Sequence, residues 1–151
     1  MRVRPANLSD VPELVKLGQS LIQEAPNYHS RQFDADVLQQ NLEGVVNGLG
    51  SIFVVEDQDE IAGGIVCLTS KDWFNNDVIA FEQVFYIKPA YRTSRASFLL
   101  LDAFIAWSKH MGASRIQCGT TTGINTRGCI RLYEHFGFTQ YGTVLDLELK
   151  A

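Results

Sequence analysis

The residues Tyr86-Ile87-Lys88-Pro89-Ala90-Tyr91-Arg92-Thr93-Ser94-Arg95-Ala96-Ser97 form the most informative stretch of this sequence. They follow an apolar run and open a long apolar segment with helical spacing, which predicts a strand, a loop and a helix in succession. The first N–H groups of a helix lack intrahelical partners and carry a partial positive charge, so a phosphate can dock there. With Lys88, Arg92 and Arg95 beside it, the loop is predicted to bind an anion.

Charge is unevenly distributed along the chain. Between residues 83 and 133 seven side chains are basic and one is acidic, a net charge of +6, whereas the other six basic and sixteen acidic residues give −10. An anionic ligand is therefore expected at the basic part, although basic side chains on solvated faces of a helix and a loop would give the same pattern. Nucleic acid is not expected as a partner, because its binders usually have a high pI and this chain has a formal net charge of −4 and a pI near 5.3.

The length of 151 residues and the hydrophobic content of 46% predict a single globular domain over residues 1–151. Met1 to Pro5 lack the apolar core of a signal peptide, and no apolar stretch approaches the ~20 residues that span a bilayer. We therefore expect a cytoplasmic protein without a membrane partner. Cys67, Cys118 and Cys129 lack metal-ligand spacing, so we expect them to fill the core rather than to act as nucleophiles or ligands, and we expect no metal.

Hydrophobic periodicity predicts the element order β-α-α-β-β-β-α-β-α-β. After a first strand, Ser9 is expected to cap one helix and Asp34 or Asp36 a second. The later elements are strands Ser51–Glu56, Ile61–Thr69 and Val78–Ile87, a helix over Phe98–Trp107, a strand Ser114–Gly119, a helix Thr126–His135 and a strand Gly142–Leu149. This order predicts an α/β (α+β) fold with one mixed, twisted sheet of about six or seven strands flanked by about four helices.

The element order, Tyr91-Arg92 before the central helix, and the segment Arg131-Leu132-Tyr133-Glu134-His135-Phe136-Gly137-Phe138 together resemble the GNAT superfamily of N-acetyltransferases over nearly the whole chain. Members hold acetyl-coenzyme A with a strand, a loop of the form Arg/Gln-x-x-Gly-x-Gly/Ala, and a helix. Here Arg92 matches, Arg95 replaces the first glycine, and Ser97 stands at the second small residue. Arginine is a good bidentate partner for phosphate, so we expect Arg95 to take up the phosphate contact itself.

The resemblance implies acetyl-coenzyme A as the cosubstrate and assigns its contacts. Free backbone N–H groups of a splayed or bulged fourth strand would meet the acetyl and pantetheine groups. Either Asn125 or Thr126 would bond the pantetheine arm, and both have the alternative role of a helix cap. The implied cofactor-binding residues are Phe85, Tyr86, Ile87, Arg92, Thr93, Ser94, Arg95, Ala96, Ser97, Asn125 and Thr126.

Two residues are candidates for the chemistry. Tyr133 matches the family tyrosine that protonates the departing thiolate, and its alternative role is packing in the core. Glu82, the only carboxylate in its strand, would take a proton from the incoming ammonium, directly or through water, or else is an exposed sheet residue without a role. His135, near Tyr133, is a minor candidate.

The resemblance implies an acyltransferase that acetylates a primary amine, in a small molecule or a peptide, by direct attack. Tyr28, His29, Trp73 and Phe74 are expected on the acceptor side, with ordinary packing as their alternative. Dimers are common in this superfamily, so a homodimer paired through the exposed part of the C-terminal strand is an option. The competing hypothesis is a non-catalytic module that binds coenzyme A or a protein and has a degenerate pyrophosphate loop, because Arg95 and Ser97 occupy the small-residue positions.

Overall fold

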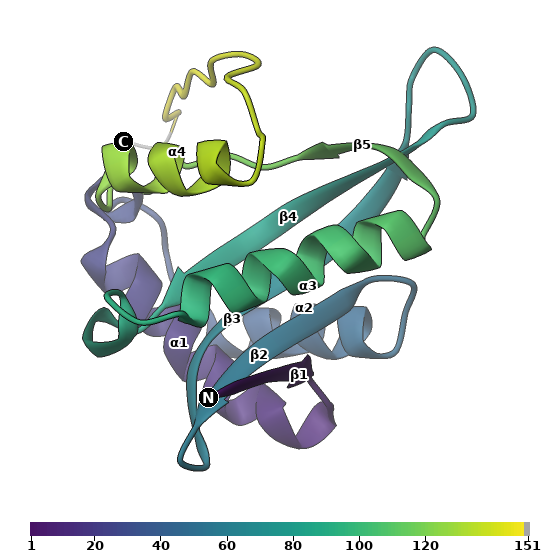
Figure 1. The fold of residues 1–151 in the computed structure, drawn as a ribbon. Coiled ribbons are helices and arrows are strands. Elements are labelled where there is room, and N and C mark those ends of the chain that lie inside the picture. The colour runs from purple at the N-terminus through teal and green to yellow at the C-terminus, as the bar shows by residue number, and fades with distance from the viewer. Residues whose placement is uncertain (150–151) are drawn as a thin grey trace.

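The computed structural model describes residues 1–149 and contains one five-stranded mixed sheet (Figure 1). Strands β1 to β4 are antiparallel neighbours in the order of the sequence, and β5 lies parallel to β4 at the edge. The strands are β1 (Arg2–Pro5), β2 (Ser51–Asp57), β3 (Glu60–Lys71), β4 (Val78–Ile87) and β5 (Ala113–Gln117).

Four α-helices cover the two faces of the sheet. Helices α1 and α2 pack on one face, and α3 and α4 pack on the other (Figure 1). Their bounds are α1 (Val11–Glu24), α2 (Ala35–Val46), α3 (Ala96–His110) and α4 (Thr126–His135), and short 3-10 turns lie at Leu8–Asp10, Pro26–Tyr28 and Pro89–Tyr91. The predicted fold class, with a mixed sheet and four helices, is confirmed. None of the helices within residues 1–149 has both the length and the apolar character that crossing a membrane requires.

The sheet separates two hydrophobic cores. Successive side chains of a strand point to opposite faces, so Ile65 belongs to the core under α3 and the neighbouring Val66 to the core under α1 and α2. Phe104 of α3 is completely buried in the first core. The weak amphipathicity of α3 that the sequence predicts agrees with its contacts to all five strands of the sheet.

The strand predicted at Gly142–Leu149 is wrong. Residues 138–149 have no regular secondary structure, and the sheet has five strands rather than six or seven. A strand must satisfy its backbone N–H and C=O groups against a neighbour, and within residues 1–149 no strand lies beside this segment. The alternating pattern is present, but no strand within residues 1–149 pairs with it.

The helix starts differ in detail from the prediction. Ser9 does not cap α1: it lies within the 3-10 turn Leu8–Asp10, which Asn7 caps by accepting the Ser9 N–H at 3.0 Å. Helix α1 starts at Val11 after Asp10, whose side chain makes no capping hydrogen bond. Asp34 caps α2 as expected, because its carboxylate accepts the N–H groups of Asp36 and Val37.

Candidate active site

Strand β4 contains a bulge in its middle. Val84 lies opposite Val66 of β3, and Glu82 lies opposite the next residue, Cys67, so Gln83 is the extra residue. A bulge interrupts the ladder and bends the strand locally. The bulged fourth strand that the resemblance implied is confirmed.

Beyond the bulge, β4 and β5 separate. Their parallel pairing runs from Val78 to Phe81 and stops there, with Phe81 opposite Gln117. From Glu82 to Ile87, the edge of β4 that faces away from β3 has no strand partner among the described residues. Backbone groups of this half-strand are therefore free to bind a ligand that enters between the two strands.

Glu82 and Tyr133 meet at the point where the strands separate. The N–H of Gly119, just after β5, donates to Glu82 Oε1 at 3.1 Å, and the Tyr133 hydroxyl donates to the Gly119 carbonyl at 3.3 Å. The ring of Tyr133 lies 6.4 Å from that of Phe85 and 5.8 Å from that of Phe138, between centroids. The two residues predicted to do the chemistry are thus held on the two sides of one peptide segment.

Burial sets the protonation of this pair. It raises the pKa of Glu82 to about 7, against the opposing effect of the Gly119 hydrogen bond. The pKa of Tyr133 is raised by burial and, secondarily, by the negative charge of Glu82. Near neutral pH the Glu82 carboxylate can therefore both hold and release a proton, and the Tyr133 hydroxyl stays protonated.

The cysteines near Glu82 are packing residues. Cys67 is fully buried in the core, and Cys118 and Cys129 pack against it, as predicted. Burial, assisted by the charge of Glu82, raises the pKa of the Cys67 and Cys118 thiols to about 12. Both stay neutral at physiological pH and are poor nucleophiles, because the thiolate is the reactive form.

The loop between β4 and α3 has ordinary backbone geometry. Arg95, at the position of the family glycine, has φ −76° and ψ 0° and directly precedes α3, so a side chain causes no conformational strain there. The Ser94 hydroxyl accepts the Ala96 N–H at 3.2 Å. The next N–H groups, of Ser97 and Phe98, bond to no backbone carbonyl in the part of the chain that the structure describes, as is usual in the first turn of a helix.

Arg92 does not extend freely into solvent. Its Nη2 donates to Glu24 Oε1 at 2.7 Å, its Nη1 pairs with the other oxygen of the same carboxylate, and its Nε donates to the Ile87 carbonyl at 3.0 Å. Tyr86 turns toward the same place and donates its hydroxyl to Glu24 Oε1 at 2.8 Å. The structure therefore joins two predicted cofactor residues, Tyr86 and Arg92, through a carboxylate that the sequence analysis did not select.

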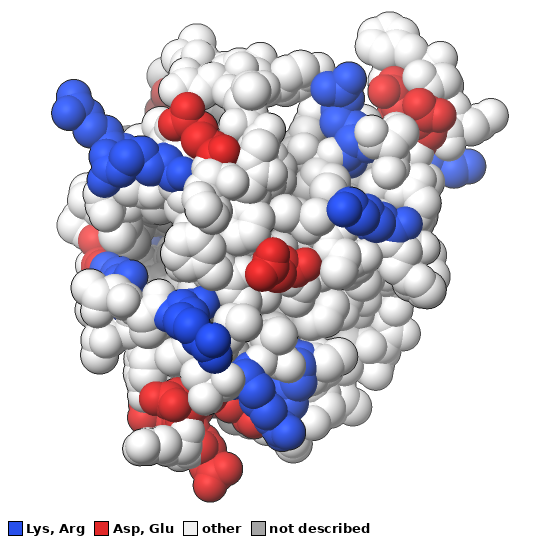
Figure 2. Space-filling view, viewed as in Figure 1, with Lys and Arg blue, Asp and Glu red and all other residues white. Residues whose placement is uncertain are grey.

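The face that carries α3 and α4 has a recess (Figure 2). It lies between α4 and the first turn of α3, as these are placed in Figure 1. Lys and Arg side chains are spread over this face rather than gathered in one patch (Figure 2). On the face shown in Figure 2, the Lys and Arg side chains therefore form no single continuous cationic patch.

Asn125 is the N-cap of α4. It adopts a left-handed conformation with φ 45°, and its side chain accepts the Gly128 N–H at 3.3 Å. Thr126 is the first residue of the helix. Of the two roles considered for Asn125, the helix cap is confirmed, and contact of either residue with a pantetheine arm stays a prediction.

The residues predicted on the acceptor side separate into two pairs. Tyr28 and its neighbour His29 follow α1, and the Tyr28 hydroxyl lies 2.6 Å from Thr121 Oγ1 in the loop after Gly119. Trp73 and Phe74 are 91% and 90% exposed at the tip of the β3–β4 hairpin, at the end of β4 opposite to the loop that contains Arg92. The structure brings the first pair close to the site and leaves the second pair away from it.

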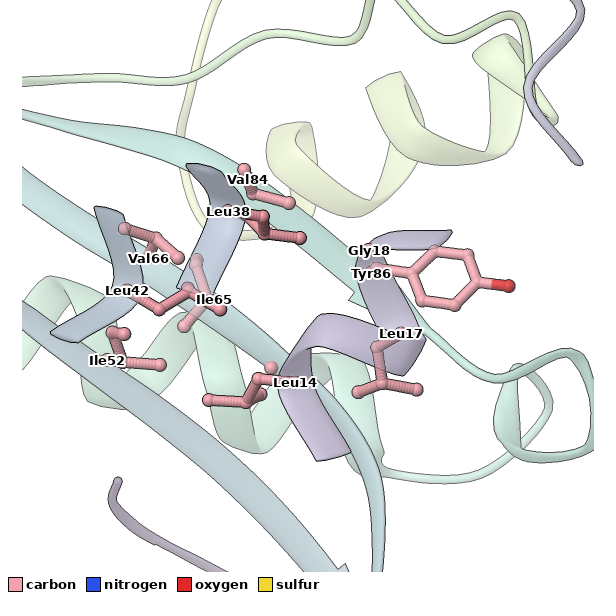
Figure 3. A pocket seen from close by; sticks show the side chains of 11 residues that line it. Leu14, Leu17, Gly18, Leu38, Leu42, Ile52, Ile65, Val66, Val84 and Tyr86 are labelled. Atoms are coloured by element: carbon pink, nitrogen blue, oxygen red, sulfur yellow. The ribbon is translucent and has the colours of Figure 1, made fainter. Parts of the chain in front are cut away.

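A small cavity lies on the other face of the sheet, between α1, α2 and strands β2 to β4 (Figure 3). Its volume is about 50 Å³, and its lining is apolar. Figure 3 shows that the ring of Tyr86 points its hydroxyl away from the other lining side chains, in agreement with the bond to Glu24. Small-molecule sites usually occupy about 300–1,000 Å³ and offer a few polar groups, so this small apolar cavity does not fit the acceptor.

Glu24, Gly119 and Thr121 are the site residues that sequence reasoning missed. A signal existed for Glu24, since a carboxylate in the last turn of a helix opposes the helix dipole unless cations or donors compensate it. Gly119 contributes through its backbone, and nothing in the identity of a residue reveals where its N–H and C=O groups will point.

Comparison with known proteins agrees with this geometry. The model of the acetyltransferase (GNAT) family matches residues 15–138, while no curated protein sequence matches the chain significantly. An integron cassette protein from the mobile metagenome of Cole Harbour Salt Marsh is 21% identical, with a TM-score of 0.80 over 99% of this chain and 91% of that one. A transcriptional regulator from Bacillus halodurans C-125 is 16% identical, with a TM-score of 0.80 over 97% and 98% of the two chains.

A third solved structure is that of AAC(6')-Iy in complex with the bisubstrate analogue CoA-S-monomethyl-acetylneamine. It is 14% identical, with a TM-score of 0.78 over 99% of this chain and 97% of that one. At such identities the structural likeness establishes the fold, and the family model covers most of the sequence. This protein belongs to the GNAT acetyltransferase family.

Proposed function

We propose that this protein is an acetyl-coenzyme A-dependent N-acetyltransferase that moves the acetyl group from the thioester to a primary amine by direct attack. The observation that carries the proposal is the meeting of Glu82 and Tyr133 at Gly119, where β4 and β5 separate. This arrangement places a group able to accept a proton and a group able to donate one at the same point of the cleft.

The cofactor would lie between the separated strands and supply the acetyl thioester. Its pantetheine arm would follow the free backbone of Phe85, Tyr86 and Ile87, with Asn125 or Thr126 near its other side. Its pyrophosphate would lie at the loop of Arg92, Thr93, Ser94, Arg95, Ala96 and Ser97, where the unbonded N–H groups of the first turn of α3 point. Arg95 makes no ion pair with any of residues 1–149, so its guanidinium is available for phosphate oxygens.

The proposed roles account for each proton. Glu82 takes a proton from the bound ammonium, directly or through a water molecule, so that the amine nitrogen can bond to the acetyl carbon. Backbone N–H groups of β4 beyond the bulge stabilise the negative charge on the carbonyl oxygen. As the carbon–sulfur bond breaks, Tyr133 gives its proton to the leaving sulfur, and the second proton that the nitrogen loses on forming the amide returns to the Tyr133 phenolate, directly or through water.

The acceptor is proposed to be a small-molecule amine. AAC(6')-Iy has been solved with an acetylneamine-containing analogue, which supports a small-molecule amine as the acceptor. Tyr28 and His29 would border the acceptor close to the site, and Trp73 and Phe74 would contact only a part of it that extends along β4. The net charge of −10 outside the basic segment favours a cationic acceptor. The proposal places the protein in the cytoplasm, without a nucleic-acid or membrane partner.

Addition of acetyl-coenzyme A should stabilise the protein strongly. At 100 times its dissociation constant a ligand adds about 2.7 kcal/mol to the free energy of unfolding, which a thermal shift measurement detects easily. Release of free thiol over a panel of aminoglycosides, polyamines and peptide amines should then identify the acceptor. Stabilisation without thiol release on any amine would favour the non-catalytic module, and the absence of any shift would exclude both cofactor hypotheses.

A homodimer is part of the same proposal. Five apolar side chains of the C-terminal segment are 77–90% exposed, and so many exposed apolar side chains within nine residues are unusual in a monomer. The Arg115 guanidinium lies 5.5 Å from the ring centroid of Tyr141, so the segment begins close to β5, whose outer edge has no strand partner within residues 1–149. Pairing of the segment with β5 of a second copy would cover the exposed apolar side chains and the unpaired strand edge. The five are Tyr141, Val144, Leu145, Leu147 and Leu149.

Light scattering after size exclusion should give the mass of a dimer for the wild-type protein. Joint replacement of Leu145→Lys and Leu147→Lys should give a monomer, because charges cannot be buried in the interface. Leu49→Lys, at another exposed leucine, is the matched control and should leave the dimer intact. A monomeric wild-type protein would refute this part of the proposal.

A further inference from the structure

Glu24 carries its negative charge at an unfavourable place. It is the last residue of α1, where the helix dipole is negative, and no basic residue lies in that last turn. The hydroxyl of Tyr86 and the guanidinium of Arg92 compensate the charge, and hydrogen bonding to Arg92 is the main cause that lowers the pKa of Glu24. A carboxylate kept at this position by two side chains from other elements holds those elements together.

All three nitrogens of the Arg92 guanidinium already interact with protein acceptors. Two of them bind the Glu24 carboxylate, the third binds the Ile87 carbonyl at the end of β4, and the guanidinium carbon lies 5.5 Å from the centroid of the Tyr86 ring. A single side chain thus connects the end of α1, the end of β4 and the loop before α3. Because Glu24 neutralises it, Arg92 presents little net positive charge to an incoming phosphate.

We infer that Glu24 is a positioning residue for the cofactor loop, which it fixes through Arg92 to the end of α1. In this arrangement Arg92 shapes the loop, and the phosphates are bound by Arg95 and by the free N–H groups at the start of α3. The inference rests on the proposed function, because it assigns a task to residues around the proposed cofactor site. It differs from the expectation based on the family motif, in which the charge of Arg92 itself contacts the cofactor.

The test compares single variants with a charge exchange. Glu24→Gln and Arg92→Gln should each raise the dissociation constant of coenzyme A about tenfold, measured by calorimetry, because either change releases the loop from α1. The double variant Glu24→Arg with Arg92→Glu restores an ion pair with its charges exchanged and should recover most of the affinity. Glu43→Gln is the matched control, since Glu43 accepts a hydrogen bond from Gln39 on the surface of α2 and contacts no part of the site.

Salt dependence separates the two arginines. Arg95→Gln should weaken coenzyme A binding and reduce its dependence on ionic strength, whereas the double variant Glu24→Gln with Arg92→Gln, which removes both charges of the neutral pair, should weaken binding and leave that dependence as in the wild type. If Arg92→Gln does not fold, Arg92→Lys replaces it: loss of the two-pronged contact should weaken binding even though the charge remains. Turnover should change mainly through the KM for acetyl-coenzyme A, with kcat preserved.

The opposite pattern would overturn the inference. If Arg92 binds phosphate directly, Glu24→Gln frees it and tightens coenzyme A binding, and the charge exchange places a repelling carboxylate at position 92 and recovers nothing. Failure of the wild-type protein to bind coenzyme A at all would be a different result, because it would refute the proposed function.

Discussion

Tyr133→Phe is expected to lower kcat by about 10²-fold or more, the range found when a general acid is removed. Within residues 1–149 the hydroxyl has one hydrogen-bond partner, the Gly119 carbonyl at 3.3 Å, so its loss should hardly change the fold. The raised pKa of Tyr133 does not argue against the role, since the burial that disfavours its phenolate equally disfavours a thiolate held beside it. Steady-state thiol release and single-turnover acetyl transfer would measure the loss.

Tyr141→Phe is the matched control, because this tyrosine is 77% exposed in the C-terminal segment. It should keep full activity. Equal thermal stability of the two variants and the wild type would show that the loss at Tyr133 is chemical. Full activity of Tyr133→Phe would remove the acid role and leave this tyrosine as a packing residue.

Glu82→Gln is expected to reduce kcat/KM by about 10²-fold at neutral pH and to change its pH profile. A base must be deprotonated to act, and burial raises the pKa of this carboxyl to about 7. The wild-type rate should therefore fall as the pH decreases through about 7, and this limb should be absent in the variant. An acidic limb that persists unchanged in Glu82→Gln would assign the titration to another group.

The same substitution, which lowers activity, should raise the relative stability of the protein at alkaline pH. The folded pKa of Glu82, about 7, lies above the ordinary value of 4.5, so between these pH values the unfolded chain releases a proton that the folded protein keeps. This group therefore favours folding below pH 4.5 and loses that contribution as the pH rises to about 7. Glu82→Gln can still accept the Gly119 N–H and does not titrate. The difference in free energy of unfolding between the variant and the wild type should therefore shift in favour of the variant from pH 5 to pH 8. Chemical denaturation at both pH values would test this.

The fold was largely predictable because its main signals are local. The apolar periodicity of α1 and the Asp34 cap of α2 lie within single elements, and the succession of strand, loop and helix around Pro89 is legible in the sequence itself. The prediction of the final strand was wrong because strand formation depends on a non-local partner. Leu145, Leu147 and Leu149 alternate like strand residues, but a strand exists only with a hydrogen-bonding neighbour, and alternation does not say whether there is one.

The site was predictable only where a side chain carries the chemistry. Tyr133 was selected by the sequence motif around it, and Glu82 was selected because it is the only acid in its strand. In the structure both residues are bonded to Gly119. The position of Glu24 at the end of α1 signalled a carboxylate that needs compensation, but its pairing with Arg92 was not predictable, because the two residues are 68 positions apart in the sequence. The backbone contacts of Gly119 have no sequence signal at all.

The short loop after β5 is secured at both of its ends by different parts of the molecule. Gly119 is bonded to Glu82 and Tyr133, whereas Thr121 and Thr122 accept hydrogen bonds from the side chain and the backbone N–H of Asn27, in the turn after α1. This loop therefore connects the turn that borders the proposed acceptor side with Glu82 and Tyr133, the two residues proposed to transfer protons. An acceptor that pushes this turn aside would strain the bonds at Gly119, so the size of the acceptor and the alignment of Glu82 with Tyr133 are mechanically linked.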